Sequence, residues 1–270
     1  MVVQHNLAAA NTNRQLGITT NSLSKSTEKL SSGYKINRAG DDAAGLTISE
    51  KMRSQIRGLD KASQNAEDGI SLIQVAEGAL NETHDILQRM NELATQAAND
   101  TNTSSDRTAI KAEIDQLSAE ITRISSTTQF NTMNLIDGTF TGKQLQVGAL
   151  SGQSITVSIG SMSATTLGVN SLSVSSFAKA GSSMTKVQAA ISKVSTMRSK
   201  LGAVQNRLEH TVKNLDTTSE NTSSAESRIR DTDMAKEMVT YSKNNILQQA
   251  GQSMLAQANQ ANQGVLSLLG

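Results

Sequence analysis

The strongest constraint on the fold is an apolar stripe that continues at steps of three or four residues from Ile48 to Ala97. Steps of this size place side chains on one face of an α-helix. The stripe consists of Ile48, Met52, Ile56, Leu59, Ala62, Ala66, Ile70, Ile73, Ala76, Leu80, His84, Leu87, Met90, Ala94 and Ala97. The chain also contains no proline, which would break a helix interior. The sequence therefore predicts one helix from Ala44 to Asn99, roughly 80 Å long.

Two more stripes predict helices that pack beside this one. The first, from Ile110 to Ile124, follows a polar turn, and Ser104 or Ser105 is expected to cap its helix. The second begins at Met184, and a polar stretch over residues 216–224 interrupts it. Between these stripes, residues 138–181 are rich in Gly, Ser and Thr and contain an alternating segment around Ile155, so we expect one or two small β-hairpins there.

Both ends of the chain carry thin apolar seams with a seven-residue spacing, which is typical of coiled coils. Each seam is too sparse to bury much surface alone, so we expect the two terminal helices to pair with each other and then with other chains. The predicted seam residues are Leu16, Leu23, Leu30, Leu247, Ala250, Met254, Ala258, Ala261, Val265 and Leu268.

The predicted fold class is all-α with a small β-hairpin region, consisting of a long antiparallel helical rod and a terminal coiled-coil-like helix pair. We expect residues 1–43 and 227–270 to form an inner domain of terminal helices. Residues 44–226 are expected to form an outer rod domain, with the hairpin region at about 138–181.

The composition argues against catalysis and against several kinds of partner. The chain has no cysteine and three histidines, without a His-Glu-x-x-His motif or a Gly-rich phosphate loop after a strand, so we expect no enzyme, cofactor or metal. A formal charge of +1 gives no basic patch for nucleic acid. No apolar run is long enough to span a membrane, and the N-terminus lacks the features of a secretory signal, so we expect no membrane contact.

Two features allow a structural and a functional interpretation. The pair Asp41 and Asp42 could bind a cation, but no third carboxylate lies nearby in sequence, which favours a turn and a helix cap. His84 lies within the apolar stripe, where a packed and hydrogen-bonded side chain is favoured over a ligand.

Several separated segments, in the same order, resemble the bacterial flagellin family. Leu30–Leu46, with the sequence LSSGYKINRAGDDAAGL, is similar to its N-terminal signature, and Ser227–Asp233 (SRIRDTD) to the start of its C-terminal region. The C-terminal segments ILQQAG, LAQANQ and VLSLL, and the central segments FN, NLIDG and QVGA, also match. The chain differs from many relatives in ending on Gly270 and in lacking a large central insert.

This resemblance implies a subunit that self-assembles into the extracellular flagellar filament for motility. It further implies secretion through the flagellar type III export apparatus, an export chaperone on the C-terminal helix, and contacts with hook-associated junction and cap proteins. The segment from Gln88 to Ala94 resembles the part of flagellin recognised by a host Toll-like receptor, which implies recognition through Arg89, Leu93 and, on the neighbouring helix, Glu113.

Two rival functions remain on sequence grounds. A hook–filament junction protein shares the N-terminal signature, although the full C-terminal match argues against it. A secreted adhesin displayed by the filament is the other rival, but the short central region leaves little room for a binding domain.

Overall fold

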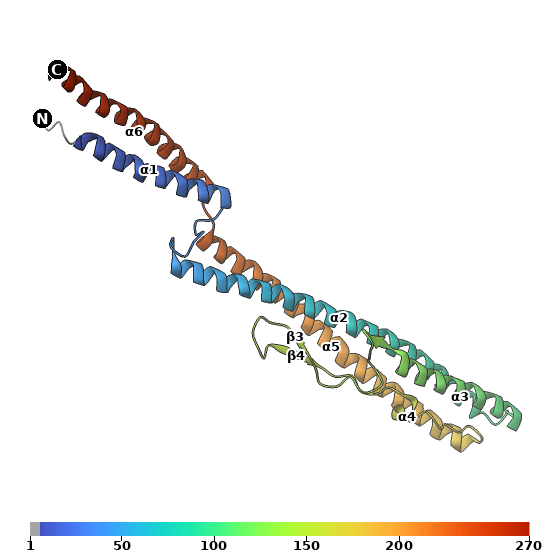
Figure 1. The fold of residues 1–270 in the computed structure, drawn as a ribbon. Coiled ribbons are helices and arrows are strands. Elements are labelled where there is room, and N and C mark those ends of the chain that lie inside the picture. Colours follow the sequence, from blue (N-terminus) through green and yellow to red (C-terminus); the bar gives the residue numbers. More distant parts are fainter. Residues whose placement is uncertain (1–5, 270) are drawn as a thin grey trace. The chain divides into compact units, whose positions relative to one another are not determined.

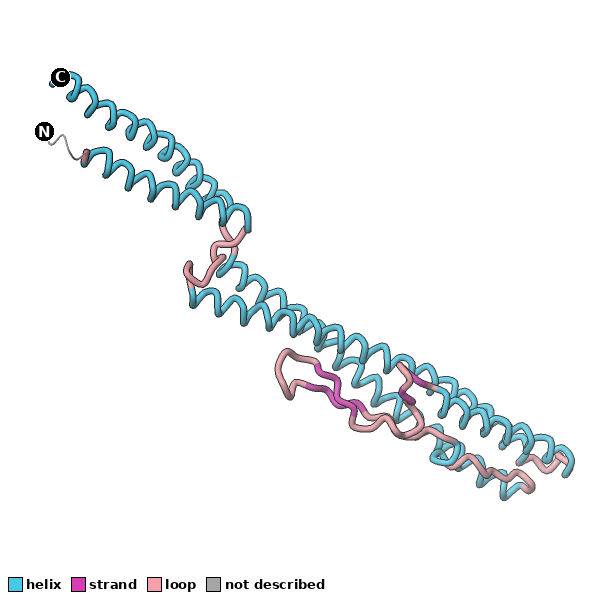
Figure 2. Tube along the Cα trace, in the orientation of Figure 1, coloured by secondary structure: helices cyan, strands magenta, loops and turns pink. Residues whose placement is uncertain are grey.

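The computed structural model describes residues 6–269, with side chains described as far as residue 260. The chain forms two compact units, one built from the residues up to Ser54 and those from Asn221 onward, the other from Gln55–Glu220. The long helices and short strand pairs confirm the predicted fold class (Figures 1 and 2). The domain boundaries predicted at residues 43/44 and 226/227 stay a prediction.

Three long helices supply most of the core of the unit Gln55–Glu220. These are α2 (Ala43–Ala97), α3 (Ser104–Thr127) and α5 (Phe177–Arg230), of which α2 and α5 begin or end outside this unit. Their buried side chains are almost all Ala, Leu, Ile, Val and Met, including Ile73, Leu80, Met90, Ile114, Ile121, Leu201 and Leu208. Small and branched aliphatic side chains interdigitate well between helices, so this unit reaches dense packing with few aromatic residues.

The helix ends follow capping rules, with one correction. Gly33 adopts a left-handed conformation (φ 76°) and ends α1 (Leu7–Ser32), while the Asp42 carboxylate accepts a hydrogen bond from the backbone N–H of Gly45 at 2.8 Å. The prediction that Ser104 or Ser105 caps α3 is wrong. Thr103 is the cap, because it forms a reciprocal capping box with Asp106, whose pKa is lowered by hydrogen bonds from the Thr103 hydroxyl and backbone N–H.

Helix α5 continues without a break through the polar stretch at 216–224 that interrupts its apolar stripe. Polar side chains replace apolar packing between α2 and α5 in this region. The Ser63 hydroxyl donates to Asp216 at 2.9 Å, and the Ser219 hydroxyl donates to Asp60 at 2.7 Å. The interruption in the stripe therefore marks a change in the kind of helix–helix contact, and the helix itself continues.

The predicted hairpin region contains one four-residue hairpin, formed by β3 (Lys143–Gln146) and β4 (Ser154–Val157) with Leu145 opposite Ile155. The hairpin packs on α2, where a Cβ at Gly69 would lie 2.5 Å from Leu145 Cδ1. A short helix, α4 (Ala164–Leu167), follows it, and a second strand pair, β1 (Gln129–Phe130) with β2 (Met133–Asn134), precedes it. Because Gly69 has no side chain, the β3–β4 hairpin can approach α2 closely.

In the other unit, α1 pairs with α6 (Met234–Leu269), as the terminal seams predict (Figure 1). The pair is antiparallel, because Asn6 contacts Ala258 while Thr20 contacts Gln248. Burial in this pair is slight: Ser26 is the buried residue of α1, and no described side chain of α6 is buried. Two helices with so little buried surface gain little free energy to offset the entropy of ordering them.

We therefore expect the terminal helices of the free subunit to be cleaved long before the unit Gln55–Glu220. Brief digestion with a broad-specificity protease, followed by mass spectrometry, should remove residues before about Asp41 and after about Ser227 and leave a helical core. Equal resistance of the termini in the free subunit and in the assembled form would contradict this expectation.

Candidate assembly surface

The antiparallel pair of α1 and α6 forms a shallow groove along one side. Its lining includes Leu16 from α1 and Leu247, Ala250, Gly251 and Met254 from α6. The helices approach closely at Gly251, where a Cβ would lie 3.3 Å from Leu16 Cδ1. At either side of this point, the Asn6 side chain donates to the Ala258 carbonyl at 3.0 Å, and the Gln248 side chain donates to Thr20 Oγ1 at 3.4 Å.

Helix α6 presents a mainly small and polar face to α1. The residues that contact α1 belong to a half-buried row at steps of three or four: Tyr241, Asn244, Gln248, Gly251, Leu255 and Ala258. Ala258 belongs to the predicted seam, whereas the other residues of this row were not predicted from the sequence, because few of them are apolar. Its signal in the sequence is the pair of small residues Gly251 and Ala258, seven residues apart, which permit close helix approach.

The apolar side chains of α6 lie largely outside this contact. Val239 and Ile246 are 70% and 67% exposed, and Leu247 and Met254 are 47% and 58% exposed. At 100° per residue, Val239, Ile246 and Ala250 lie on the side of the helix opposite the α1-facing row. Leu247 and Met254 lie between that side and the row, and both line the groove together with Ala250. We call these five residues the outer face of α6. An exposed row of large apolar side chains marks a surface for interaction.

The predicted seam residues therefore fall into different environments. Leu16, Leu23, Leu30 and Ala258 are half-buried, whereas Leu247, Ala250 and Met254 are exposed. The structure brings Leu16, Leu247, Ala250 and Met254 together in one groove. The side chains of Ala261, Val265 and Leu268 lie outside the described residues, and the role of the whole seam in polymerisation stays a prediction.

The segment that follows α1 and the segment that precedes α6 are joined at Tyr34. Tyr34 and Asp231 form an antiparallel β-bridge, in which the N–H of Lys35 donates to the Arg230 carbonyl at 2.7 Å. The N–H of Thr232 donates to the Gly33 carbonyl at 3.0 Å. These bonds tie the start of the C-terminal helix to the end of the N-terminal one.

Two guanidinium groups flank the Tyr34 ring and reinforce this junction. The guanidinium carbons of Arg230 and Arg53 lie 4.8 Å and 5.8 Å from the ring centre, within the range of cation–π attraction. The pKa of Arg53 is raised, first by its hydrogen bond to the Tyr34 hydroxyl and also by Glu226, whose carboxylate lies 3.2 Å away. Glu226 is only 9% exposed, so Arg53 neutralises a charge that is largely removed from water.

Asp41 and Asp42, for which the sequence favours a turn and a helix cap over a cation site, lie in the same region. Asp41 accepts hydrogen bonds from the N–H groups of Arg38 and Asn37, and these bonds hold its pKa below the usual range. Within the described part of the chain, no cluster of three or more His, Cys, Asp or Glu side chains could hold a metal ion. The turn-and-cap interpretation therefore accounts for both carboxylates.

The residues expected at the receptor surface lie on α2 and α3. Arg89 donates to Glu113 at 3.0 Å and to Glu92 at 3.1 Å, and the Arg89 and Glu113 side chains are 52% and 46% exposed. Leu93 is 2% exposed and belongs to the core. Leu93 is therefore not accessible in the single chain, and the expected recognition through Arg89, Leu93 and Glu113 stays a prediction. Leu93 lies in the last turns of α2, which ends at Ala97, and its side chain belongs to the core cluster that also contains Ile110 and Ile114 of α3.

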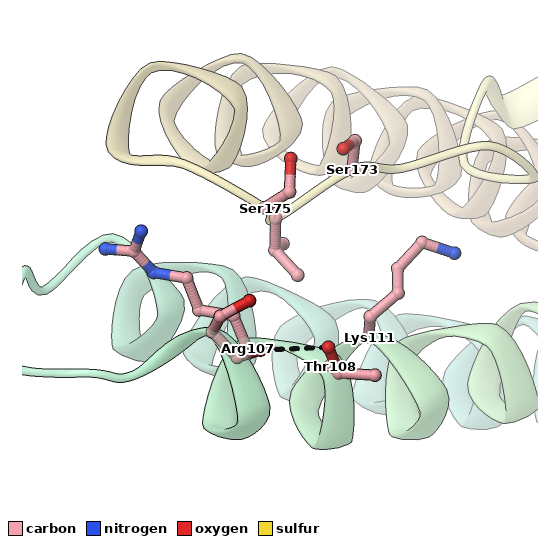
Figure 3. Close-up of a pocket in the computed structure, with 7 residues that line it drawn as sticks. Arg107, Thr108, Lys111, Ser173 and Ser175 are labelled. Atoms are coloured by element: carbon pink, nitrogen blue, oxygen red, sulfur yellow. Dashed lines mark hydrogen bonds between the residues drawn. The ribbon is translucent and has the colours of Figure 1, made fainter.

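A small pocket near the start of α3 combines two basic side chains with serine residues from the segment before α5 (Figure 3). Arg107 already donates to the Ala97 carbonyl and to Asp100, and Lys111 is paired with Asp115. The Thr108 hydroxyl donates to the Ser104 carbonyl at 2.9 Å, the bond drawn in Figure 3. Both basic side chains of the pocket are therefore already paired with carboxylates of the protein. None of the described helices is both long and apolar enough to cross a membrane.

Comparison with known families assigns nearly the whole chain. Residues 3–141 match the bacterial flagellin N-terminal helical region, and residues 184–269 match the bacterial flagellin C-terminal helical region. The chain is 56% identical to a flagellin of Halalkalibacterium halodurans and 51% identical to a flagellin of Bacillus subtilis, in each case over the full length of both proteins.

Solved structures agree with this assignment. The crystal structure of Bacillus cereus flagellin is similar with a TM-score of 0.52 and 32% identity, covering 56% of this chain and 88% of that one. The structure of a putative flagellar hook-associated protein from Vibrio parahaemolyticus matches with a TM-score of 0.59 over 71% of this chain and 100% of that one, at 12% identity. The second likeness concerns the fold alone.

The junction at Tyr34 generates a testable expectation. Tyr34→Leu removes the ring between Arg53 and Arg230, and we expect it to weaken the terminal unit by about 1–2 kcal/mol, since a desolvated cation–π contact contributes up to about 2 kcal/mol. Tyr34→Phe keeps the ring and serves as the control. Hydrogen–deuterium exchange should show faster exchange at Lys35 and Thr232 in Tyr34→Leu than in Tyr34→Phe. Identical exchange in the two variants would show that the ring contributes nothing to the junction.

Proposed function

We propose that this chain, which belongs to the bacterial flagellin family and is a structural subunit of the flagellar filament rather than an enzyme, assembles through the outer face of α6. The observation that supports the proposed role of α6 is the exposure of large apolar side chains on its outer face, which α1 leaves uncovered. A filament of identical subunits repeats each apolar contact along its length. Burying one Leu side chain stabilises by roughly 1.5–3 kcal/mol, so a repeated contact of this kind is sufficient to drive polymerisation.

The slight burial of the α1–α6 pair supports the same proposal. Leu16, Leu23 and Leu30 are only half-buried in the single subunit, so neighbouring subunits can still cover part of their surface. We assign the terminal helices, residues 1–43 and 227–270, to the inner part of the filament and residues 44–226 to an outer rod. This arrangement places the apolar outer face of α6 where other subunits surround it.

The same face suits the partners that the free subunit meets before assembly. We propose that an export chaperone covers α6 in the cell, because an uncovered apolar row would promote premature association. Type III export to the extracellular filament and contacts with the junction and cap proteins complete the proposed pathway.

A second proposed function is recognition of the free subunit by the host Toll-like receptor. The supporting observation is the exposed ion-pair cluster of Arg89, Glu92 and Glu113, which offers directional charge to a partner. The pKa of Arg89 is raised, first by its hydrogen bond to Glu113 and next by its hydrogen bond to Glu92. Leu93 lies in the core and is proposed to shape this surface from below.

Leu247→Asp tests the assembly proposal. The substitution places a charge on the outer face of α6, and an unpaired charge in a buried seam costs several kcal/mol. We expect the variant to keep the helical circular-dichroism spectrum and melting temperature of the wild-type monomer but to fail to elongate from filament seeds. Gln252→Asp adds the same charge at an exposed polar position on the same helix, roughly 120° or more around the axis from the residues of the outer face, and should elongate. Wild-type elongation by Leu247→Asp would refute the seam.

Receptor recognition has its own test. Arg89→Ala combined with Glu113→Ala removes the exposed pair without opening the core, and we expect receptor signalling by the soluble subunit to fall about tenfold or more, because contact hot spots typically cost 2 kcal/mol or more. Leu93→Ala is unsuitable alone, since a core truncation costs about 2–5 kcal/mol in stability. Lys111→Ala with Asp115→Ala removes another exposed pair on α3 as a control. Unchanged reporter activation by the first double variant would exclude this surface.

A further inference from the structure

The methionines of α6 are unusually accessible compared with those of the helical core. Met234, Met238 and Met254 are 47%, 51% and 58% exposed, whereas Met90 is fully buried and Met162 is 7% exposed. The chain contains no cysteine, so methionine thioethers are its only readily oxidised sulfur atoms. An oxidant that meets the free subunit therefore finds its soft sulfur concentrated on one helix.

Met254 occupies the most sensitive of these positions. It lies seven residues after Leu247 and four after Ala250, and all three line the groove with Leu16. This is the surface assigned above to subunit contact. A polar atom placed here would be removed from water on assembly without a donor designed to pair with it, which opposes association.

We propose that Met254 is an oxidation-sensitive assembly switch, at which a peroxide converts the free subunit into a form that cannot join the filament. The inference rests on the proposed role of the outer face of α6 in assembly. The thioether sulfur attacks one peroxide oxygen, the O–O bond breaks and an S–O bond forms. The methionine is oxidised by two electrons to the sulfoxide, and hydrogen peroxide is reduced to water.

The switch acts on the subunit and spares the polymer. In the free chain the Met254 thioether is exposed to solvent, whereas in the filament the seam covers it. Oxidation is reversible, because methionine sulfoxide reductases restore the thioether. Met234 and Met238 are oxidised alongside Met254, but they lie in the first two turns of α6 and outside the groove.

The test compares seeded elongation by purified full-length subunit before and after treatment with hydrogen peroxide, with peptide mass spectrometry to measure sulfoxide at each methionine. We expect oxidation to raise the critical concentration roughly tenfold or more, because burying an unpaired polar group weakens the binding of a subunit to the filament end by at least that factor. Treatment with both methionine sulfoxide reductases should restore elongation. The critical concentration of untreated Met254→Leu is measured first and serves as its own reference. We expect peroxide to leave that value unchanged, while Met133→Leu, which removes an exposed methionine elsewhere, should lose elongation like the wild type.

The outcomes separate this inference from the proposed function. If the untreated subunit fails to elongate from seeds, the proposed assembly function fails. If the untreated subunit elongates and the fully oxidised wild type elongates equally well, the switch does not exist. If oxidised Met254→Leu is inhibited as strongly as oxidised wild type, Met254 is not its site. Should Met254→Leu itself assemble poorly, partly oxidised wild type decides the question. Met254 sulfoxide should then be depleted in the filaments and enriched in the unincorporated subunits, and an equal share in both would overturn the proposal.

Discussion

Helix α6 has more apolar surface than its partner within the chain can cover, and this imbalance governs how the protein works. Its face toward α1 is made of small and polar residues such as Gly251 and Gln248, which allow close contact but bury little. Its outer face carries Val239 and Ile246, which remain about two-thirds exposed. A chain with this distribution of side chains is incomplete as a monomer. We propose that copies of the chain supply the missing cover.

The rest of the chain meets the opposite requirement. The unit Gln55–Glu220 buries a continuous aliphatic core between α2, α3 and α5 and can stay folded whether or not the termini are ordered. The junction at Tyr34 holds the segment after α1 to the segment before α6 with two backbone hydrogen bonds, and two arginines lie beside its ring. A subunit built in this way combines a self-sufficient body with terminal helices that depend on neighbours.

Much of this organisation could be predicted from the sequence, because long helices without proline leave a clear periodicity. The apolar stripe gives α2 to within two residues at each end. The α1-facing row of α6 could not be predicted in this way, since close packing through Gly251 and Ala258 leaves no apolar stripe. The burial of Leu93 could not be predicted either, because it depends on where α3 packs. At the start of α3, Thr103 is preferred as the cap because Asp106 completes the reciprocal hydrogen bonds.

Hydroxyl-radical footprinting measures the central claim directly, because it reports the solvent exposure of individual side chains in the free subunit and in the filament. We expect Val239, Ile246 and Leu247 to be labelled readily in the free subunit and to be strongly protected in the filament. Ile73 and Leu80, which are fully buried in the single chain, should be protected in both states and serve as internal references. Labelling of Val239 and Ile246 that is equal in the free and assembled forms would contradict the account, since the outer face of α6 would then remain in water in the filament.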